Sequence, residues 1–127
     1  MAGSPIETAQ INSPNGHLTA DGLALINNCR GMYRLSGNSP AVSLTLSNLT
    51  VTGNSVGGMT LQNGALTLRN STVSNNGAEG GVTLYADVTA DLGTTASPGG
   101  NTFTGNEGPQ FNSFVTAGRT VTAVGNT

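Results

Sequence analysis

The sequence has no lysine, no tryptophan and a single cysteine, and charges of either sign are scarce. Charged residues make up 8% of the 127 residues, against about 25% in an average domain, and the formal net charge is −2. Four arginines cannot form the basic stripe that nucleic acid recognition needs, so we expect no nucleic acid partner. No apolar run approaches about 18 residues, so we expect no membrane-spanning helix.

The single cysteine, Cys29, excludes an internal disulfide. One histidine, His17, lies 12 residues upstream, which is a weak indication of a nucleophilic site, and we expect a free thiol in a turn. The six acidic residues form no dense cluster of oxygen ligands. We therefore expect neither a metal ion nor a cofactor.

Small and turn-forming residues are abundant, since Gly, Thr, Asn and Ser together account for 63 of the 127 residues. Strong helix formers are few and do not recur at helical spacing, which excludes a helical bundle. Apolar residues instead alternate with polar ones over short segments such as residues 44–46, 49–51 and 59–61. This pattern predicts an all-β protein made of short strands.

An internal repeat with a period of 22 to 26 residues runs along the chain. The segment 44–54 recurs 22 residues later as 66–76, and residues 23–28 match 49–54 at a shift of 26. A fourth unit begins at Val88, carries a long corner loop at 93–101 and rejoins the pattern after it. The repeat makes the chain, 1–127, a single repeat domain, either complete or a fragment of a longer solenoid.

Each unit contains three short strands separated by Asn, Gly and Ser, which tolerate the positive φ of tight corners. A coil with three sides is a right-handed parallel β-helix, and we expect about four to five coils of 22–26 residues. Each strand would pair with its equivalent one coil on, about 4.8 Å away. The predicted inward columns are Leu18, Leu44, Leu66 and Val88; Leu25, Val51, Val73 and Phe103; and Leu35, Leu61 and Leu84.

A polar column is predicted at one corner of the coil. It consists of Asn28, Asn54, Asn76 and Asn106. An asparagine stacked on an asparagine can bond to its neighbour and to buried turn backbone, so we interpret this column as a structural ladder.

The coil pattern resembles that of the pectate-lyase-like right-handed β-helix superfamily. The stretch from Ala90 to Asn106, with its Ser-Pro-Gly-Gly-Asn-Thr-Phe-Thr-Gly-Asn segment at 97–106, resembles bacterial DUF1565-type β-helix proteins. The resemblance covers roughly residues 17–112 and implies the fold. It supplies no catalytic motif for individual residues.

An enzymatic alternative follows from the same resemblance. Polysaccharide hydrolases of this fold have two or three clustered carboxylates, for which Asp87 and Asp91 are the candidates here. A lyase would need Arg69 or Arg34 as its base. The repeat, however, places Arg69 and Asp91 in one outward column, which favours a surface ion pair over an active site.

Outward positions offer two binding surfaces. Thr45, Thr67 and Thr89 form a predicted column of hydroxyls, faintly like the threonine arrays of ice-binding solenoids. Tyr85 and Phe114 are the candidate exposed platform for sugar stacking. The remaining aromatic positions, Tyr33, Phe103 and Phe111, are predicted to point inward.

The pattern continues toward both ends, in residues 6–16 and 119–127, so we expect a fragment or a unit that associates through open solenoid ends. Together these features favour a non-enzymatic extracellular or cell-surface scaffold. It would contact polysaccharide or another protein through a flat face or the loop at 93–101. A carbohydrate-active enzyme and an ice- or surface-binding protein are the alternatives.

Overall fold

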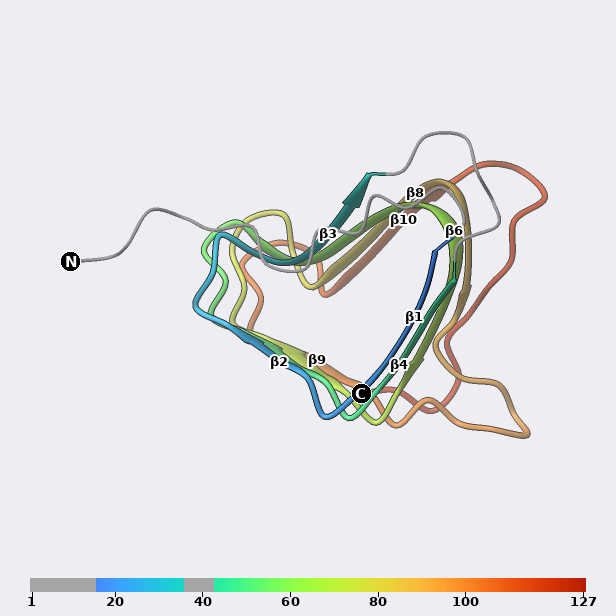
Figure 1. Cartoon of the computed structure of the whole chain (residues 1–127), viewed down its shortest axis with the longest axis horizontal. Helices are drawn as coiled ribbons and strands as arrows, with labels where there is room; N and C mark the ends of the chain where they lie inside the picture. Colours follow the sequence, from blue (N-terminus) through green and yellow to red (C-terminus); the bar gives the residue numbers. More distant parts are fainter. Residues whose placement is uncertain (1–15, 36–42) are drawn as a thin grey trace.

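The computed structural model describes residues 16–35 and 43–127, which form a solenoid with strands on three sides (Figure 1). Within these residues every regular element is a strand. The strands are β1 (His17–Asp21), β2 (Ala24–Ile26), β3 (Arg30–Leu35), β4 (Ser43–Ser47), β5 (Thr50–Thr52), β6 (Gly57–Arg69), β7 (Thr72–Ser74), β8 (Val82–Asp91), β9 (Thr102–Thr104), β10 (Phe111–Val115) and β11 (Val121–Thr122).

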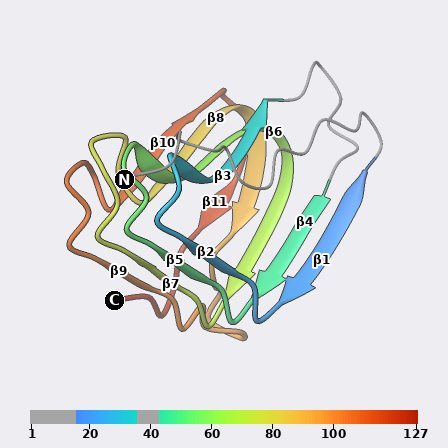
Figure 2. The ribbon, with the colours of Figure 1, turned by 60° about the vertical axis from the view of Figure 1, so that its left-hand side comes forward.

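All strand pairs are parallel and join equivalent positions of successive coils (Figure 2). One side is a four-stranded sheet in the order β2-β5-β7-β9. The other two sides form one seven-stranded sheet, because β6 and β8 continue through a corner. The first part of β6 pairs with β3 and the last part pairs with β4. The predicted all-β parallel solenoid is confirmed, but the described residues form about three turns where four to five coils were predicted. In two of the coils, two of the three predicted strands are joined into one, β6 and β8.

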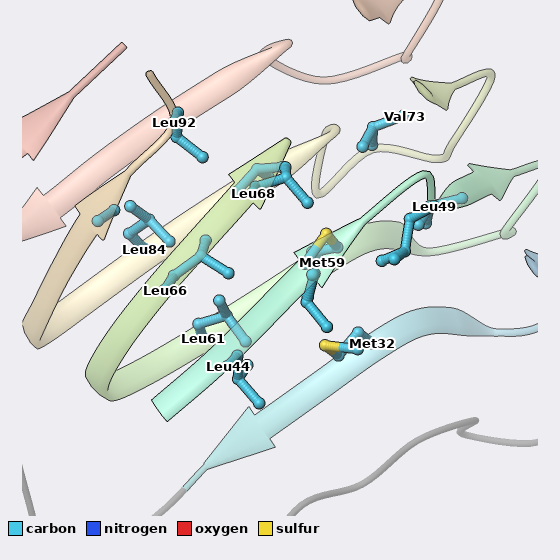
Figure 3. Close-up of a cluster of buried hydrophobic side chains, with 14 of the residues drawn as sticks. Met32, Leu44, Leu49, Met59, Leu61, Leu66, Leu68, Val73, Leu84 and Leu92 are labelled. Atoms are coloured by element: carbon cyan, nitrogen blue, oxygen red, sulfur yellow. The ribbon is translucent and has the colours of Figure 1, made fainter. Parts of the chain in front are cut away.

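The core lies between the three sides, where side chains of equivalent strands stack along the solenoid axis (Figure 3). The column Leu25, Val51, Val73 and Phe103 is in the predicted register. Leu18, Leu44 and Leu66 are also in register. Leu66, Leu68 and Leu84 are at most 2% exposed, so removing one of these side chains would cost about 2–5 kcal/mol.

The predicted column Leu18, Leu44, Leu66 and Val88 was wrong at its last member. Leu66 pairs with Ala90, and Val88 pairs with Gly64. The reason is two extra residues. One lies in the corner between Asn76 and Val82, and the other lies at an irregularity in the β6–β8 pairing between Gln62 and Gly64. Together they move Val88 by two positions and leave it buried on the inward face.

The third column was wrong at its first member. Leu35 pairs with Gln62, and Arg34 pairs with Leu61. Leu61 and Leu84 are in register as predicted. The corner before β3 is one residue shorter than the corner before β6, which moves the pairing by one. The predicted coil at residues 6–16 lies outside the described residues except for Gly16.

The corner between the four-stranded sheet and β3, β6, β8 and β10 holds the asparagine column Asn28, Asn54, Asn76 and Asn106. Asn54 Nδ2 donates to Asn76 Oδ1 at 2.8 Å, and Asn76 Nδ2 donates to Asn106 Oδ1 at 2.8 Å. Each of these asparagine Oδ1 atoms also accepts from the backbone N–H of the residue before it in the column. The structure therefore brings all four together as a continuous hydrogen-bonded ladder.

A second polar ladder, which sequence reasoning missed, occupies the corner before the four-stranded sheet. Ser71 Oγ accepts from Leu49 N–H, Asn101 Oδ1 accepts from Ser71 N–H, and Asn126 Oδ1 accepts from Asn101 N–H. Asn101 Nδ2 donates to Leu68 O at 3.0 Å. Successive coils have Leu, Ser or Asn at this position, so the column cannot be recognised as a repeat in the sequence. The Ser and Asn side chains nevertheless accept from the backbone in the same way.

Glycine is required where β3, β6 and β8 leave the asparagine corner. A Cβ on Gly31 would meet Gly58 O at 2.6 Å, and one on Gly58 would contact Gly81 O. A Cβ on Gly81 would in turn contact Gln110 O. This glycine column lets successive coils approach closely enough for the corner asparagines to bond.

Candidate functional site

A groove of about 390 Å³ runs across the outward side of β3, β6, β8 and β10. Its floor comes from successive strands and is lined by Tyr33, Thr60, Thr83, Tyr85, Asn112 and Phe114. Its wall comes from two corner loops and includes Ala78, Glu79 and Pro109. Because the four strands are neighbours in the sheet, the groove lies along the solenoid axis and spans about 14 Å from β3 to β10.

Arg30 and Glu79 form the ion pair of the groove. Arg30 Nε donates to Glu79 Oε2 at 2.9 Å, and Arg30 Nη2 lies 2.6 Å from Glu79 Oε1. The two residues are 49 apart in sequence: Arg30 is the first residue of β3, and Glu79 lies in the corner before β8, two coils on. The pair is bidentate, which fixes the plane of the carboxylate as well as its position.

Further contacts hold Glu79 in place. Thr83 Oγ1 donates to the Glu79 backbone carbonyl at 3.0 Å, and Thr60 Oγ1 lies 3.5 Å from Oε2. The hydrogen bond and charge of Arg30 hold the pKa of Glu79 below its usual value, although burial opposes this. The groove therefore presents an ionised carboxylate that is fixed before any ligand arrives.

An aromatic pair and a cation–π pair line the same groove as this carboxylate. The rings of Tyr85 and Phe114 stack with centroids 5.3 Å apart and an interplanar angle of 13°. The two side chains are in register on adjacent strands and are exposed, at 41% and 55%. We call this pair the aromatic ledge. It brings together the two residues that the sequence suggested as a platform.

The second pair corrects a sequence prediction. Tyr33 was predicted to point inward, but it pairs with Thr60 and lines the outward groove, with the Arg30 guanidinium 4.7 Å from its ring centroid. The one-residue difference at the β3 corner exchanges the two faces of the strand and explains the error. Phe103 and Phe111 pack against the core as expected.

The candidate catalytic carboxylates are each bound to an arginine. Asp91 Oδ2 lies 2.7 Å from Arg69 Nη2, as the expected surface pair, although Asp91 is in register with Thr67 and not with Arg69. Asp87 Oδ1 lies 3.3 Å from Arg119 Nη2 and accepts from Thr116 Oγ1 at 2.8 Å.

These partners lower the pKa of both aspartates. For Asp91 the main cause is the hydrogen bond from Arg69, and for Asp87 it is the hydrogen bond from Thr116 followed by the charge of Arg119. A glycosidase general acid needs a raised pKa, so the environment of each carboxylate is opposite to that role. Asp87 and Asp91 also lie outside the groove lining.

The predicted threonine column was wrong at Thr89. Thr45 pairs with Thr67, but Thr67 pairs with Asp91, while Thr89 pairs with Ala65. The two extra residues that displace Val88 displace Thr89 as well. The column on this side is therefore interrupted by an ion pair.

A more regular hydroxyl array lies on the four-stranded sheet. One row contains Thr50, Thr72 and Thr102, and the other contains Thr52, Ser74 and Thr104, of which Ser74 is buried. Ser74 Oγ donates to Thr52 Oγ1 at 3.1 Å. The four strands contain no charged residue. This surface, which we call the threonine rows, was not selected from the sequence.

His17 and Cys29 do not meet in the structure. His17 Nδ1 lies 2.6 Å from Ser43 Oγ, and Cys29 is a free, half-buried thiol at the asparagine corner. Among residues 16–35 and 43–127, no three His, Cys, Asp or Glu side chains are placed to hold a metal ion. The same residues include no helix of the length and hydropathy needed to span a membrane.

The comparisons with known proteins are negative. No protein-family model, no curated protein and no solved structure matches the chain. The fold is therefore established by the strand pairing described above.

Sequence reasoning did not select Arg30 or Glu79. Glu79 lies in the corner between Asn76 and Val82, which is the longest of the asparagine corners described. The extra length of this corner could have indicated that its residues cover part of the adjacent sheet and form one side of a groove.

Proposed function

We propose that this solenoid is a non-enzymatic binding module that holds a segment of polysaccharide in the groove across β3, β6, β8 and β10. The observation that carries the proposal is the aromatic ledge of Tyr85 and Phe114 beside the fixed carboxylate of Glu79. Sugars present apolar C–H faces and vicinal hydroxyls, which match an aromatic surface and a bidentate acceptor.

The rigidity of the scaffold supports this proposal. Every groove strand is hydrogen-bonded to a neighbour over a stacked core, so the site requires little rearrangement on binding. A preformed site loses less entropy when a flexible chain binds. The ion pairs of Asp87 and Asp91 with arginines favour binding over hydrolysis.

The test is affinity electrophoresis and calorimetry with a panel of soluble polysaccharides. Tyr85→Ala and Phe114→Ala should each weaken binding by about tenfold, because each removes apolar contact area. Ile26→Ala is the matched control, since Ile26 is 45% exposed on another side of the coil. Retention of full affinity in both aromatic variants would contradict the proposal, and binding of a protein partner through the same ledge would replace polysaccharide as the ligand.

The remaining parts of the functional interpretation are also proposals. The resemblance to pectate-lyase-like and DUF1565-type β-helices is supported by the coil period and the asparagine ladder. A polysaccharide ligand favours a location outside the cell or at its surface. Self-association through solenoid ends stays a prediction, to be checked by size-exclusion chromatography with light scattering.

Ice or crystal-surface binding is a second candidate, favoured by the threonine rows. Adjacent strands repeat at about 4.8 Å and alternate residues at about 6.7 Å, so the hydroxyls and methyl groups form a rigid two-dimensional grid. The uncharged character of the four strands suits an ordered water surface. This candidate uses a different side of the coil from the groove and can be tested independently.

A further inference from the structure

The charge distribution in the groove discriminates between classes of glycan. Arg30 and Glu79 are the charged residues of the groove lining, and they neutralise each other. Their exposure differs, because the Glu79 side chain is 40% exposed and the Arg30 side chain is 21% exposed. A ligand in the groove therefore has more access to the carboxylate of Glu79 than to the guanidinium of Arg30.

The guanidinium is further covered by its other contacts. It lies over the Tyr33 ring on one face and binds both oxygens of Glu79 on its edge. Replacing Glu79 by a ligand carboxylate would break this bidentate pair, which is a strong interaction. Because its guanidinium is already bound to Glu79 and Tyr33, Arg30 is poorly placed to bind the carboxylate of an acidic sugar.

The carboxylate retains the capacity to accept hydrogen bonds. Two carboxylate oxygens offer about four lone-pair positions, and Arg30 and Thr60 occupy part of them. Hydroxyl donors of a neutral sugar complement the rest. A uronate in the same place would bring a second negative charge within a few ångströms of the first, which is unfavourable.

The direction of the groove adds a constraint on shape. The aromatic ledge lies on β8 and β10, and the Arg30–Tyr33 pair lies at the β3 end, so an occupant must cross several strands to contact both. A chain lying along the solenoid axis satisfies this, whereas a monosaccharide does not.

Resting on the proposed function, we infer that the groove takes an uncharged glycan chain lying along the solenoid axis, and that Glu79 rejects acidic chains. The aromatic ledge by itself does not distinguish neutral from acidic glycans, whereas Glu79 does. It also assigns Glu79 a specificity role distinct from catalysis.

The experiment uses calorimetry of the full chain with hexasaccharides in matched pairs: β-1,4-glucan with β-1,4-glucuronan, and α-1,4-galactan with α-1,4-galacturonan. The neutral member of at least one pair should bind about tenfold more tightly than its carboxylated partner at low salt. Added salt should reduce this ratio of affinities, because salt screens like-charge repulsion and so strengthens the binding of the acidic hexasaccharide. This readout needs no variant.

Glu79→Gln should weaken the neutral hexasaccharide about fivefold and reduce the neutral-to-acidic ratio. Asp87→Asn is the control, since it makes the same charge change and also removes an arginine ion pair, outside the groove lining. Equal or tighter binding of the acidic members by the wild type overturns the inference and leaves the proposed function standing. Binding of neither member of either pair overturns both.

Discussion

Gln110 accepts hydrogen bonds from Asn106 at the position where the asparagine ladder would have its next member. Asn106 Nδ2 lies 2.7 Å from Gln110 Oε1, and Asn106 N lies 3.4 Å from the same atom. The Asn76–Asn106 step has the same pair of bonds, at 2.8 and 3.0 Å. Gln110 also returns a bond from Nε2 to the Asn106 carbonyl. Gln110 Oε1 thus accepts the two hydrogen bonds that an asparagine of the next coil would accept.

Removing an internal member of the ladder should be far more damaging than removing this end. Asn76 is fully buried and exchanges bonds with Asn54, Asn106 and the Val51 carbonyl. Asn76→Ala leaves these buried groups unpaired, so we expect a loss of about 2–4 kcal/mol in the free energy of unfolding, measured by urea denaturation. Gln110→Ala should cost less than about 1 kcal/mol, because water can replace an exposed side chain. Equal losses would contradict the ladder's assigned role.

Gly58→Ala tests the close approach of the coils. The new Cβ would contact Gly81 O and come within 3.0 Å of Val73 Cγ1 and Asn76 Nδ2. Because the nearest obstacle is backbone, we expect a loss of about 2–3 kcal/mol of stability in thermal or urea unfolding. Ser55→Ala, an exposed change in the same corner, serves as the control and should have little effect. A fully stable Gly58→Ala variant would show that the coils can separate at this corner.

The register errors show what a repeating sequence can and cannot specify. Phe103 was placed correctly because β9 has three residues, like β7, and pairs without irregularity. Ala90 was missed because two extra residues, one in the corner before β8 and one within β8, together shift the alignment of β8 on β6 by two positions from the one that the repeat suggests. Alternation has a period of two, so an even shift leaves every side chain on the same face and is invisible in the pattern. An odd shift, as at Leu35, exchanges the faces and misplaced Tyr33.

The groove was predictable in part. Tyr85 and Phe114 could be selected because outward positions follow from alternation within one strand. The Arg30–Glu79 pair joins corners 49 residues apart, and its formation depends on corner lengths that differ from coil to coil. Irregular corners have no periodic signal, so sequence reasoning locates the faces of a solenoid better than the walls built on them.

The ion pair of the groove should make stability depend on pH. The pKa of Glu79 is lowered in the folded state by Arg30, so the folded state binds fewer protons than the unfolded chain near the ordinary carboxylate pKa. Its stabilising contribution is therefore present at neutral pH and is lost as the pH falls below the ordinary carboxylate pKa and through the lowered pKa of the folded state.

The measurement for this prediction is the melting temperature of wild type and Glu79→Gln at about pH 7 and about pH 3. The wild type should be the more stable at neutral pH, and the difference should shrink on acidification, when Glu79 is protonated. The effect is small, since the pair is partly exposed. A difference in melting temperature between the two proteins that grows at low pH would contradict this prediction.

Asp91→Asn tests the enzymatic alternative. The change removes the charge that pairs with Arg69 while keeping an oxygen that can accept from Gly93 N–H. We expect unchanged polysaccharide binding and a stability change below about 1 kcal/mol, measured by calorimetry and urea unfolding. A screen for cleavage of neutral and acidic polysaccharides accompanies it. Turnover by the wild type that Asp91→Asn abolishes would establish an enzyme in place of a binding module.

Thr72→Val tests the threonine rows. Thr72 is exposed in the middle of one row, and valine keeps its shape while removing the hydroxyl. If this surface binds ice, the variant should lose thermal hysteresis, measured by nanolitre osmometry, while Thr67→Val on the other side should retain it. Hysteresis that persists in Thr72→Val, or is absent in the wild type, would remove this candidate.

The long corner loop at 93–101 leaves the coil stack without disturbing it. Asn101 Nδ2 binds the Leu92 carbonyl at 3.3 Å, so the two ends of the excursion are joined across its base, and Thr94 N–H binds the Ser97 carbonyl within it. The coil after it resumes the ordinary pairing of β9 with β7. This corner is consequently a natural insertion point for foreign peptides. An epitope or tag grafted between Thr95 and Ser97 would be displayed on a rigid stem, leaving the groove and the threonine rows intact.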